Sequence, residues 1–234
     1  MKPGILYSGN QGSFSWEAGR RAKTQHPELT DFLLIESLDP PTAIQRFWDR
    51  EFSHALIPVF NPSLGGAVPS SKLGFIEVGC PLPEEDTPLD QWLARFTELN
   101  KDKIMGKPIP LPIDFYIHAL PGTKPENVKR LAAYSMAVKQ CEQGILRVVG
   151  HTFENVPYSD TGKAAHDLRS LSDDPNYEET DPESAALKPL DQTAILGPAW
   201  CAELFGLETL WSGVQDLPEG NVTTFILLRN PDTL

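Results

Sequence analysis

The sequence has few cysteines and lacks the residue spacing typical of a metal site. Its three cysteines, Cys80, Cys141 and Cys201, are far apart in a chain of 234 residues, and none belongs to a CxxC pair. A disulfide framework or a structural zinc site is therefore not expected, and a reducing compartment fits this usage best. The five histidines are also scattered along the chain. Because metal ligands recur at characteristic short spacings, we expect no metal site.

Basic residues and long apolar runs are scarce as well. Against 32 aspartates and glutamates there are 20 lysines and arginines, which gives a formal net charge of −12. Nucleic acid or an anionic membrane would need a basic face on the protein, so neither is expected as a partner. No stretch approaches the ~18 apolar residues of a membrane span, and residues 1–7 lack the apolar core of a secretory signal. We therefore expect a cytoplasmic protein.

What the sequence does contain is an alternation of strand and helix patterns in its first quarter. Short apolar runs over 4–8, 31–35 and 55–60 alternate with helical patterns over 16–23 and 41–52. This order predicts an α/β fold with parallel strands, in which ligands bind beyond the carboxyl ends of the strands.

Two polar loops that contain glycine directly follow two of these strands. The first loop includes Gly12 and Ser13 and leads into a predicted helix, and the second includes Ser63 and Gly65. Free backbone N–H groups at a helix N-terminus favour anions, so we predict an anion site at these loops. For the first loop, a plain strand-to-helix connection with a serine N-cap is the alternative.

A predicted strand over 223–228 returns near the C-terminus after an excursion of more than a hundred residues. This pattern predicts two lobes with the chain crossing between them twice, and a ligand held in the cleft where the lobes close. We expect lobe 1 at about 1–72 plus 208–234 and lobe 2 at about 73–207. Residues 1–234 then form a single domain of two lobes.

Six landmarks, in order along the chain, resemble those of the prephenate dehydratase family. They are GNQGSFS at 9–15, IPVFNPSLGG at 57–66, QC at 140–141, DTGKAA at 160–165, TAI at 193–195 with AELFGL at 202–207, and QD at 215–216 with NVTTF at 221–225. The resemblance covers nearly the whole chain. It implies a catalytic domain of two α/β lobes, like a periplasmic binding protein of the second type, that needs no metal or organic cofactor.

The sequence also departs from the family pattern. Phe60 stands where the family has a glutamate, Ala133 where it has a serine, and Thr224 where it has an arginine. Two insertions, near 81–107 and 171–188, enlarge the second lobe, and the acidic residues of the latter predict a solvated, mobile loop. Because the resemblance ends with the catalytic domain, we expect no phenylalanine-sensing regulatory domain.

The reaction that the resemblance implies is the loss of carbon dioxide and hydroxide from prephenate, a small dicarboxylate, to give phenylpyruvate in aromatic amino-acid or related specialised biosynthesis. Aromatisation drives this reaction, so the protein chiefly binds two carboxylates and helps the 4-hydroxyl to leave. By position in the motif, Thr223 provides the donor within about 3 Å of that hydroxyl, with Asn61 beside the substrate. The predicted substrate contacts are Gly12, Ser13, Ser63, Gly65, Gln140, Asp160, Thr161, Thr224 and Phe225.

Several of these residues have a simpler structural interpretation. Thr223 could be an ordinary β-branched residue of a terminal strand, and Asn61 could begin an Asx turn. Gln140 could lie on a helix surface, and Asp160 could be an N-cap. Two other functions also stay open, a prephenate decarboxylase that does not aromatise its substrate and a non-catalytic module that binds a small acid. The sequence leaves the oligomeric state open, a homo-oligomer included.

Overall fold

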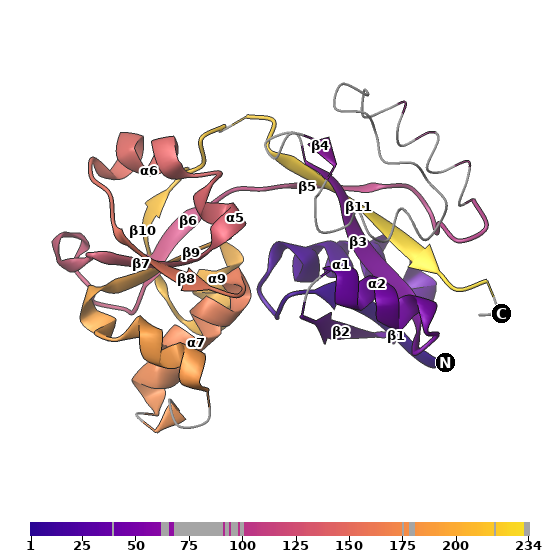
Figure 1. Ribbon diagram of the computed structural model, residues 1–234, viewed down its shortest axis with the longest axis horizontal. Helices are drawn as coiled ribbons and strands as arrows, with labels where there is room; N and C mark the ends of the chain where they lie inside the picture. Colours follow the sequence, from indigo (N-terminus) through magenta and orange to yellow (C-terminus); the bar gives the residue numbers. More distant parts are fainter. Residues whose placement is uncertain are drawn as a thin grey trace. The chain divides into compact units, whose positions relative to one another are not determined.

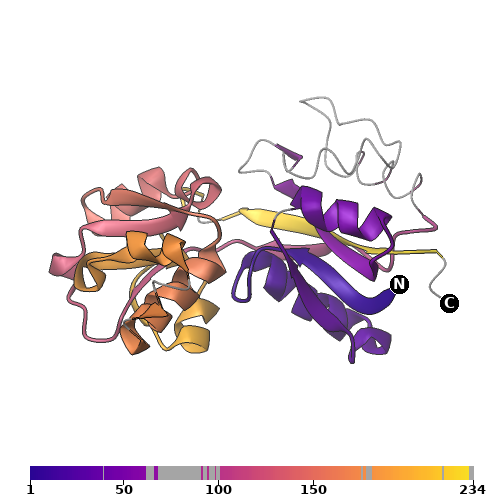
Figure 2. The ribbon, with the colours of Figure 1, turned by 60° about the horizontal axis from the view of Figure 1, so that its bottom comes forward.

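The computed structural model describes residues 1–38, 40–61, 66–67, 91, 94, 98, 101–174, 176–177, 181–217 and 219–231. The chain divides into two compact α/β units, which Figures 1 and 2 show from two sides. Unit 1 consists of Met1–Gly9, Phe14–Pro112 and Gly220–Leu234, and unit 2 of Asn10–Ser13 and Ile113–Glu219.

These bounds differ from those expected for the two lobes. Strand β5 (Ile109–Pro112) pairs with β11 (Val222–Arg229), so the chain stays in unit 1 to residue 112 rather than leaving at 73. Strand β10 (Glu208–Ser212) pairs with β6 (Tyr116–Ala119), so it belongs to unit 2 and not to lobe 1. Strand pairing decides the division, and it joins segments that are far apart in the sequence.

Unit 1 is built on one mixed sheet with the strand order β2-β1-β3-β11-β5, to which β4 adds at β3. Its other elements are β1 (Lys2–Ser8), α1 (Phe14–Gln25), η1 (Pro27–Leu29), β2 (Leu33–Ser37), α2 (Pro40–Trp48), β3 (Phe52–Asn61) and β4 (Gly66–Ala67). The first three strands are parallel to one another, as predicted. Strand β11 pairs antiparallel with β3, and β5 pairs antiparallel with β11. β3 is buried along nearly its whole length, as expected for a continuous apolar run in the middle of a sheet.

Unit 2 is built on a second mixed sheet with the strand order β10-β6-β9-β7-β8. Its other strands are β7 (Arg130–Tyr134), β8 (Glu154–Tyr158) and β9 (Thr193–Gly197). Its helices are η4 (Pro125–Asn127), α5 (Ser135–Val138), α6 (Glu142–Val149), α7 (Thr161–Asp173), η5 (Pro182–Leu187), η6 (Leu190–Gln192) and α9 (Trp200–Phe205). α7 packs on this sheet through Ala165 and Leu168, which belong to one buried cluster with Val156 and Ile195.

The acidic segment at 171–188 is not a solvated loop in its described part, so that prediction is wrong. α7 continues to Asp173, and η5 then buries Ser184 and Leu187 completely. Leu187 belongs to the hydrophobic cluster under α7, and its burial there explains why this segment packs on the protein rather than forming a solvated loop. Most of the other insertion, near 81–107, lies outside the described residues.

Among the helices that the structure describes, none combines the length and the apolar character needed to cross a membrane.

Candidate functional site

Thr223, the predicted donor to the leaving hydroxyl, lies side by side in unit 1 with Asn61, which is predicted beside the substrate. Asn61 ends β3, and Thr223 lies on β11, next to the position where Thr224 pairs with Phe60. The side-chain nitrogen Nδ2 of Asn61 donates to Thr223 Oγ1 at 2.7 Å and to Asn221 Oδ1 at 3.2 Å. All three side chains are buried. These hydrogen bonds are therefore shielded from competing water.

The hydrogen bond from Asn61 determines what the hydroxyl of Thr223 can do. A threonine hydroxyl has one hydrogen to donate and lone pairs that accept. Because Thr223 Oγ1 accepts from Asn61, its own hydrogen remains to be donated to another acceptor. The pair is thus suited to hold a hydrogen-bond donor toward a ligand oxygen.

Two further predicted contacts, Thr224 and Phe225, follow Thr223 on the same strand. Side chains alternate between the two faces of a sheet, so Thr223 and Phe225 share one face and Thr224 points to the other. Phe225 is 2 % exposed and is a core side chain. Thr223 and Thr224 therefore do not act on one ligand from the same face.

Phe60, which replaces the family's glutamate, faces the core of unit 1. It packs against the cluster that includes Ile57 and Ile226. Since it directly precedes Asn61 in an extended strand, it lies on the opposite face from Asn61. The substitution of the glutamate thus adds apolar packing on the face that points away from the Asn61 amide.

The glycine loop at Asn10–Ser13 packs onto the N-terminus of α7 within unit 2. Asp160 is the N-cap of this helix, and its Oδ1 accepts from the N–H groups of Gly162 at 2.8 Å and Lys163 at 3.0 Å. The same oxygen accepts a third bond, at 3.3 Å, from the N–H of Asn10. Asp160 is therefore the N-cap of α7, as its simpler structural interpretation proposed. Its carboxylate occupies the position at the helix N-terminus where an external anion would bind.

Close approach of backbone to backbone holds this loop on the helix. A Cβ atom on Gly162 would lie 2.3 Å from the carbonyl oxygen of Gln11, so only glycine fits here. Gly12 has a φ of +91°, and its carbonyl accepts from Trp200 Nε1 at 2.8 Å. Ser13 is buried, and its N–H donates within the loop to the carbonyl of Asn10 at 3.0 Å. The predicted anion-binding N–H of Ser13 is thus engaged inside the protein.

The remaining predicted substrate contacts are Gln140, Thr161, Ser63 and Gly65. Gln140 lies between α5 and α6, and its Nε2 donates to a backbone carbonyl one turn earlier at 3.0 Å. The backbone carbonyl of Gln140 accepts from the N–H of Asp216 at 2.7 Å. The side-chain oxygen Oδ1 of Asp216 in turn accepts from the N–H of Gly144 at 2.7 Å. Asp216, the second residue of the family's Gln-Asp pair, therefore holds the start of α6 in place. Thr161 is the buried first residue of α7, while Ser63 and Gly65 lie outside the described residues.

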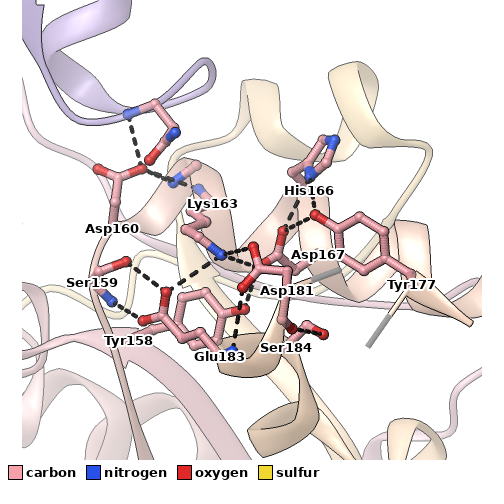
Figure 3. A network of polar contacts seen from close by, with 12 residues as sticks. Tyr158, Ser159, Asp160, Lys163, His166, Asp167, Tyr177, Asp181, Glu183 and Ser184 are labelled. Carbon is pink, nitrogen blue, oxygen red and sulfur yellow. Dashed lines mark hydrogen bonds and ion pairs between the residues drawn. The ribbon is translucent and has the colours of Figure 1, made fainter. Parts of the chain in front are cut away.

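A polar cluster around Lys163 was not predicted from the sequence (Figure 3). Lys163 Nζ lies 2.5 Å from Asp167 Oδ2, 2.5 Å from Asp181 Oδ2 and 3.3 Å from Glu183 Oε2. Glu183 in turn accepts bonds from both the N–H and the hydroxyl of Ser159, at 3.0 Å each. The spacing of Lys163 and Asp167, one helical turn apart, is a signal that the sequence offers. The contribution of η5 is not readable from it.

The surroundings keep both partners at the centre of this cluster charged. Burial opposes the charge of Lys163, but hydrogen bonds to Asp167 and Asp181 outweigh it and raise the pKa of the lysine. Burial likewise opposes ionisation of Asp167, but bonds donated by Lys163, Tyr158, His166 and Tyr177 bring its pKa below the ordinary value. The charge of Lys163 is thus balanced by carboxylates of the chain itself.

Within the part of the chain that the structure describes, no three histidine, cysteine, aspartate or glutamate side chains gather in a way that could hold a metal ion.

The model of the prephenate dehydratase family matches residues 5–233, so the chain belongs to this family. The match spans both α/β units and includes the Asn61–Thr223 pair and the Asp160 N-cap. It confirms the family that the sequence landmarks indicated.

Individual relatives agree with this assignment over different lengths. Arogenate dehydratase 1 of Petunia hybrida is 33% identical over 129 residues, which are 55% of this chain and 26% of that protein. The match thus spans about a quarter of the length of this relative. A prephenate dehydratase from Arthrobacter aurescens, solved in complex with L-Phe, has a TM-score of 0.59 at 20% identity, over 98% of this chain and 61% of its own.

A second solved structure shares this fold. GqqA, described as a novel type of quorum quenching acylase, has a TM-score of 0.60 at 21% identity, over 98% of this chain and 65% of its own. These two structures establish a common fold, and the predicted α/β architecture of two units is confirmed. A shared fold does not by itself determine the reaction.

Proposed function

We propose that the chain is a dehydratase that converts prephenate, or a close analogue such as arogenate, with loss of carbon dioxide and water. Membership of the prephenate dehydratase family supports this reaction class. The single structural observation that carries the proposal is the 2.7 Å hydrogen bond from Asn61 Nδ2 to Thr223 Oγ1. This bond leaves the hydrogen of Thr223 for the leaving hydroxyl of the substrate.

In the proposed step, the bond between the ring and its carboxylate breaks and releases carbon dioxide. The electron pair of that bond completes the aromatic ring as the C4–O bond breaks, and the oxygen leaves as hydroxide. Negative charge therefore builds on this oxygen, and a hydrogen bond from Thr223 stabilises it more strongly in the transition state than in the bound substrate. Asn61 would hold the threonine oxygen in place.

The other predicted contacts enter the proposal with different roles. Gly12, Ser13, Gln140, Thr161 and the undescribed Ser63 and Gly65 stay predicted substrate contacts. Asp160 is proposed to act as the N-cap that holds the glycine loop. A small dicarboxylate substrate and a cytoplasmic location stay predictions, as does the absence of a required cofactor, and the oligomeric state stays open.

One assay distinguishes the proposed reaction from its alternatives. Purified protein is incubated with prephenate and, separately, with arogenate, and the products are identified by ultraviolet absorbance and mass. Phenylpyruvate or phenylalanine supports the dehydratase. A product that has lost carbon dioxide but keeps its hydroxyl oxygen would indicate the non-aromatising decarboxylase. Thermal stabilisation by either acid without turnover would indicate a non-catalytic module that binds a small acid.

Thr223→Ala tests the donor directly. We expect kcat to fall by at least ~10-fold, because a positioned proton or hydrogen-bond donor typically contributes ~10² or more. Thr223→Ser keeps the hydroxyl and is the matched control, with kcat much closer to that of the wild type. A fully active Thr223→Ala variant would remove this hydroxyl from the mechanism.

A further inference from the structure

Asn221 is a third member of the hydrogen-bonded row at Thr223. It directly precedes β11 and lies two residues before Thr223, so the two side chains share a face of the sheet. Its Oδ1 accepts from Asn61 Nδ2 at 3.2 Å, and the same nitrogen donates to Thr223 Oγ1 at 2.7 Å. The exposed fractions of Asn61 and Asn221 are 1 % and 6 %.

The orientation of the Asn61 amide decides the direction of the threonine hydrogen. An amide presents two hydrogens at nitrogen and only lone pairs at oxygen. With nitrogen toward Thr223, the threonine accepts and its hydrogen points elsewhere. If the amide turned over, its oxygen would accept that hydrogen, and the threonine could no longer donate it to a substrate. The group that accepts the second hydrogen of this nitrogen therefore helps to fix the direction of the threonine hydrogen.

We propose that Asn221 is a positioning residue that fixes the Asn61 amide with its nitrogen toward Thr223 and so directs the Thr223 hydroxyl to the leaving oxygen. Asn221 acts through Asn61 and need not touch the substrate. This inference rests on the proposed dehydratase function, and it adds a residue that acts on the orientation of the donor.

A purely structural role for the Asn221 side chain is a weaker explanation. β11 is held by backbone pairing to β3 on one side and to β5 on the other. Removal of one side-chain acceptor leaves both ladders intact. It leaves a buried hydrogen of Asn61 without its acceptor, which favours rotation of the amide.

Two substitutions at residue 221 separate these roles. Asn221→Leu has similar volume and cannot accept, and we expect kcat to fall by about 10-fold with KM changed by no more than about twofold. The carboxylate introduced by Asn221→Asp, when ionised, accepts hydrogen bonds and donates none, so it enforces the proposed amide orientation. At pH 8 we therefore expect kcat of this variant to remain within about threefold of the wild type. Loss of activity in Asn221→Asp with activity retained in Asn221→Leu would overturn the proposal.

Asn230 offers a matched control just beyond the other end of β11. It is also a buried asparagine, with Nδ2 donating to the carbonyl of Phe47 at 3.2 Å. It lies seven residues from Thr223, about 23 Å along an extended strand. Asn230→Leu is expected to lower the melting temperature and to leave kcat unchanged. An equal fall of kcat in Asn230→Leu and Asn221→Leu would assign the effect to general destabilisation and overturn the proposal.

A double-mutant cycle tests whether Asn221 acts through Asn61. In the Asn61→Ala background, Asn221→Leu should change kcat by less than about twofold, since the group through which it acts is gone. Two independent losses that multiply would overturn the proposal while leaving the dehydratase function intact. A wild-type protein that converts neither prephenate nor arogenate would overturn the proposed function itself, and this inference with it.

Discussion

Among single residues, the buried histidines His54 and His118 show packing rather than a catalytic environment. His118 is completely buried on β6, with Nδ1 at 3.0 Å from Thr209 Oγ1 and Nε2 at 3.0 Å from the carbonyl of Pro198. Burial lowers its pKa. His54 on β3 is 3 % exposed, and burial, aided by the charge of Arg229, lowers its pKa to about 4. Both rings are therefore neutral at pH 7.

The pKa of His54 predicts a loss of stability in mild acid. The unfolded chain binds a proton at this histidine near pH 6.5, whereas the folded chain does so only near pH 4. The stabilisation is thus fully present above pH 6.5 and is lost as the pH falls toward 4. It amounts to roughly 3 kcal/mol for the full shift.

Urea unfolding at pH values between 7.5 and 4.5 measures this loss. His54→Gln carries no titratable ring, so its free energy of unfolding should fall less steeply over this range. His151→Gln, at an exposed histidine, is the control and should keep the wild-type slope. An unchanged slope in His54→Gln would show that other groups carry the acid sensitivity.

At the scale of elements, the contact of η5 with α7 combines apolar burial with charge. Leu187 fills the cluster under the helix, and Lys163 of α7 binds Asp181 and Glu183 at and near the start of η5. Glu183 also binds Ser159, which directly precedes the N-cap Asp160. η5 thus supports the segment from which the N-cap holds the glycine loop.

Lys163→Met is expected to destabilise the protein by about 3–5 kcal/mol, because it leaves the buried carboxylate of Asp167 without its cation. The free energy of urea unfolding provides the measurement. Hydrogen exchange at 181–187 should accelerate as well, since this segment loses its ionic attachment to α7.

The same helix offers a control for this prediction. Arg169 and Asp173 form an ion pair with the same spacing but with both side chains exposed. Arg169→Met should therefore change the free energy of unfolding by less than about 1 kcal/mol. Lys163→Met/Asp167→Asn should recover part of the loss, because it removes the uncompensated charge. Equal effects of the two single substitutions would contradict a special role for Lys163.

At the scale of the whole molecule, the excess of acidic residues bears on stability. The net charge is −12, and Lys163 in the first turn of α7 is surrounded by carboxylates. Net charge of this size destabilises a compact state through self-repulsion. Salt screens such repulsion over a Debye length of about 10 Å at 0.1 M.

Raising sodium chloride from low concentration to physiological ionic strength should therefore raise the melting temperature at pH 7.5. A gain of about 1 kcal/mol corresponds to about 2–4 °C for a chain of this length. Near pH 4.8, where the sequence has no net charge, the rise should disappear. A melting temperature that falls with salt at pH 7.5 would mean that attractive ion pairs outweigh the net repulsion.

The sequence by itself determined the α/β class, the family and many of the elements. The strands β1, β3, β9 and β11 are apolar runs whose burial follows from local composition, and the family landmarks are short local motifs. Such signals need no knowledge of distant segments. The pairing of Asn61 with Thr223 was also within reach, because both belong to landmarks of the same family.

Only the tertiary structure decided which residues meet. The N–H of Asn10 reaches Asp160, 150 residues away, and Glu183 folds back onto Ser159 and Lys163. The register of β11 against β3 turned Thr224 and Phe60 away from the Thr223–Asn61 face. These contacts depend on strand pairing and on close backbone packing between segments far apart in the chain. Local residue patterns do not encode such long-range geometry, so it was open until the fold was known.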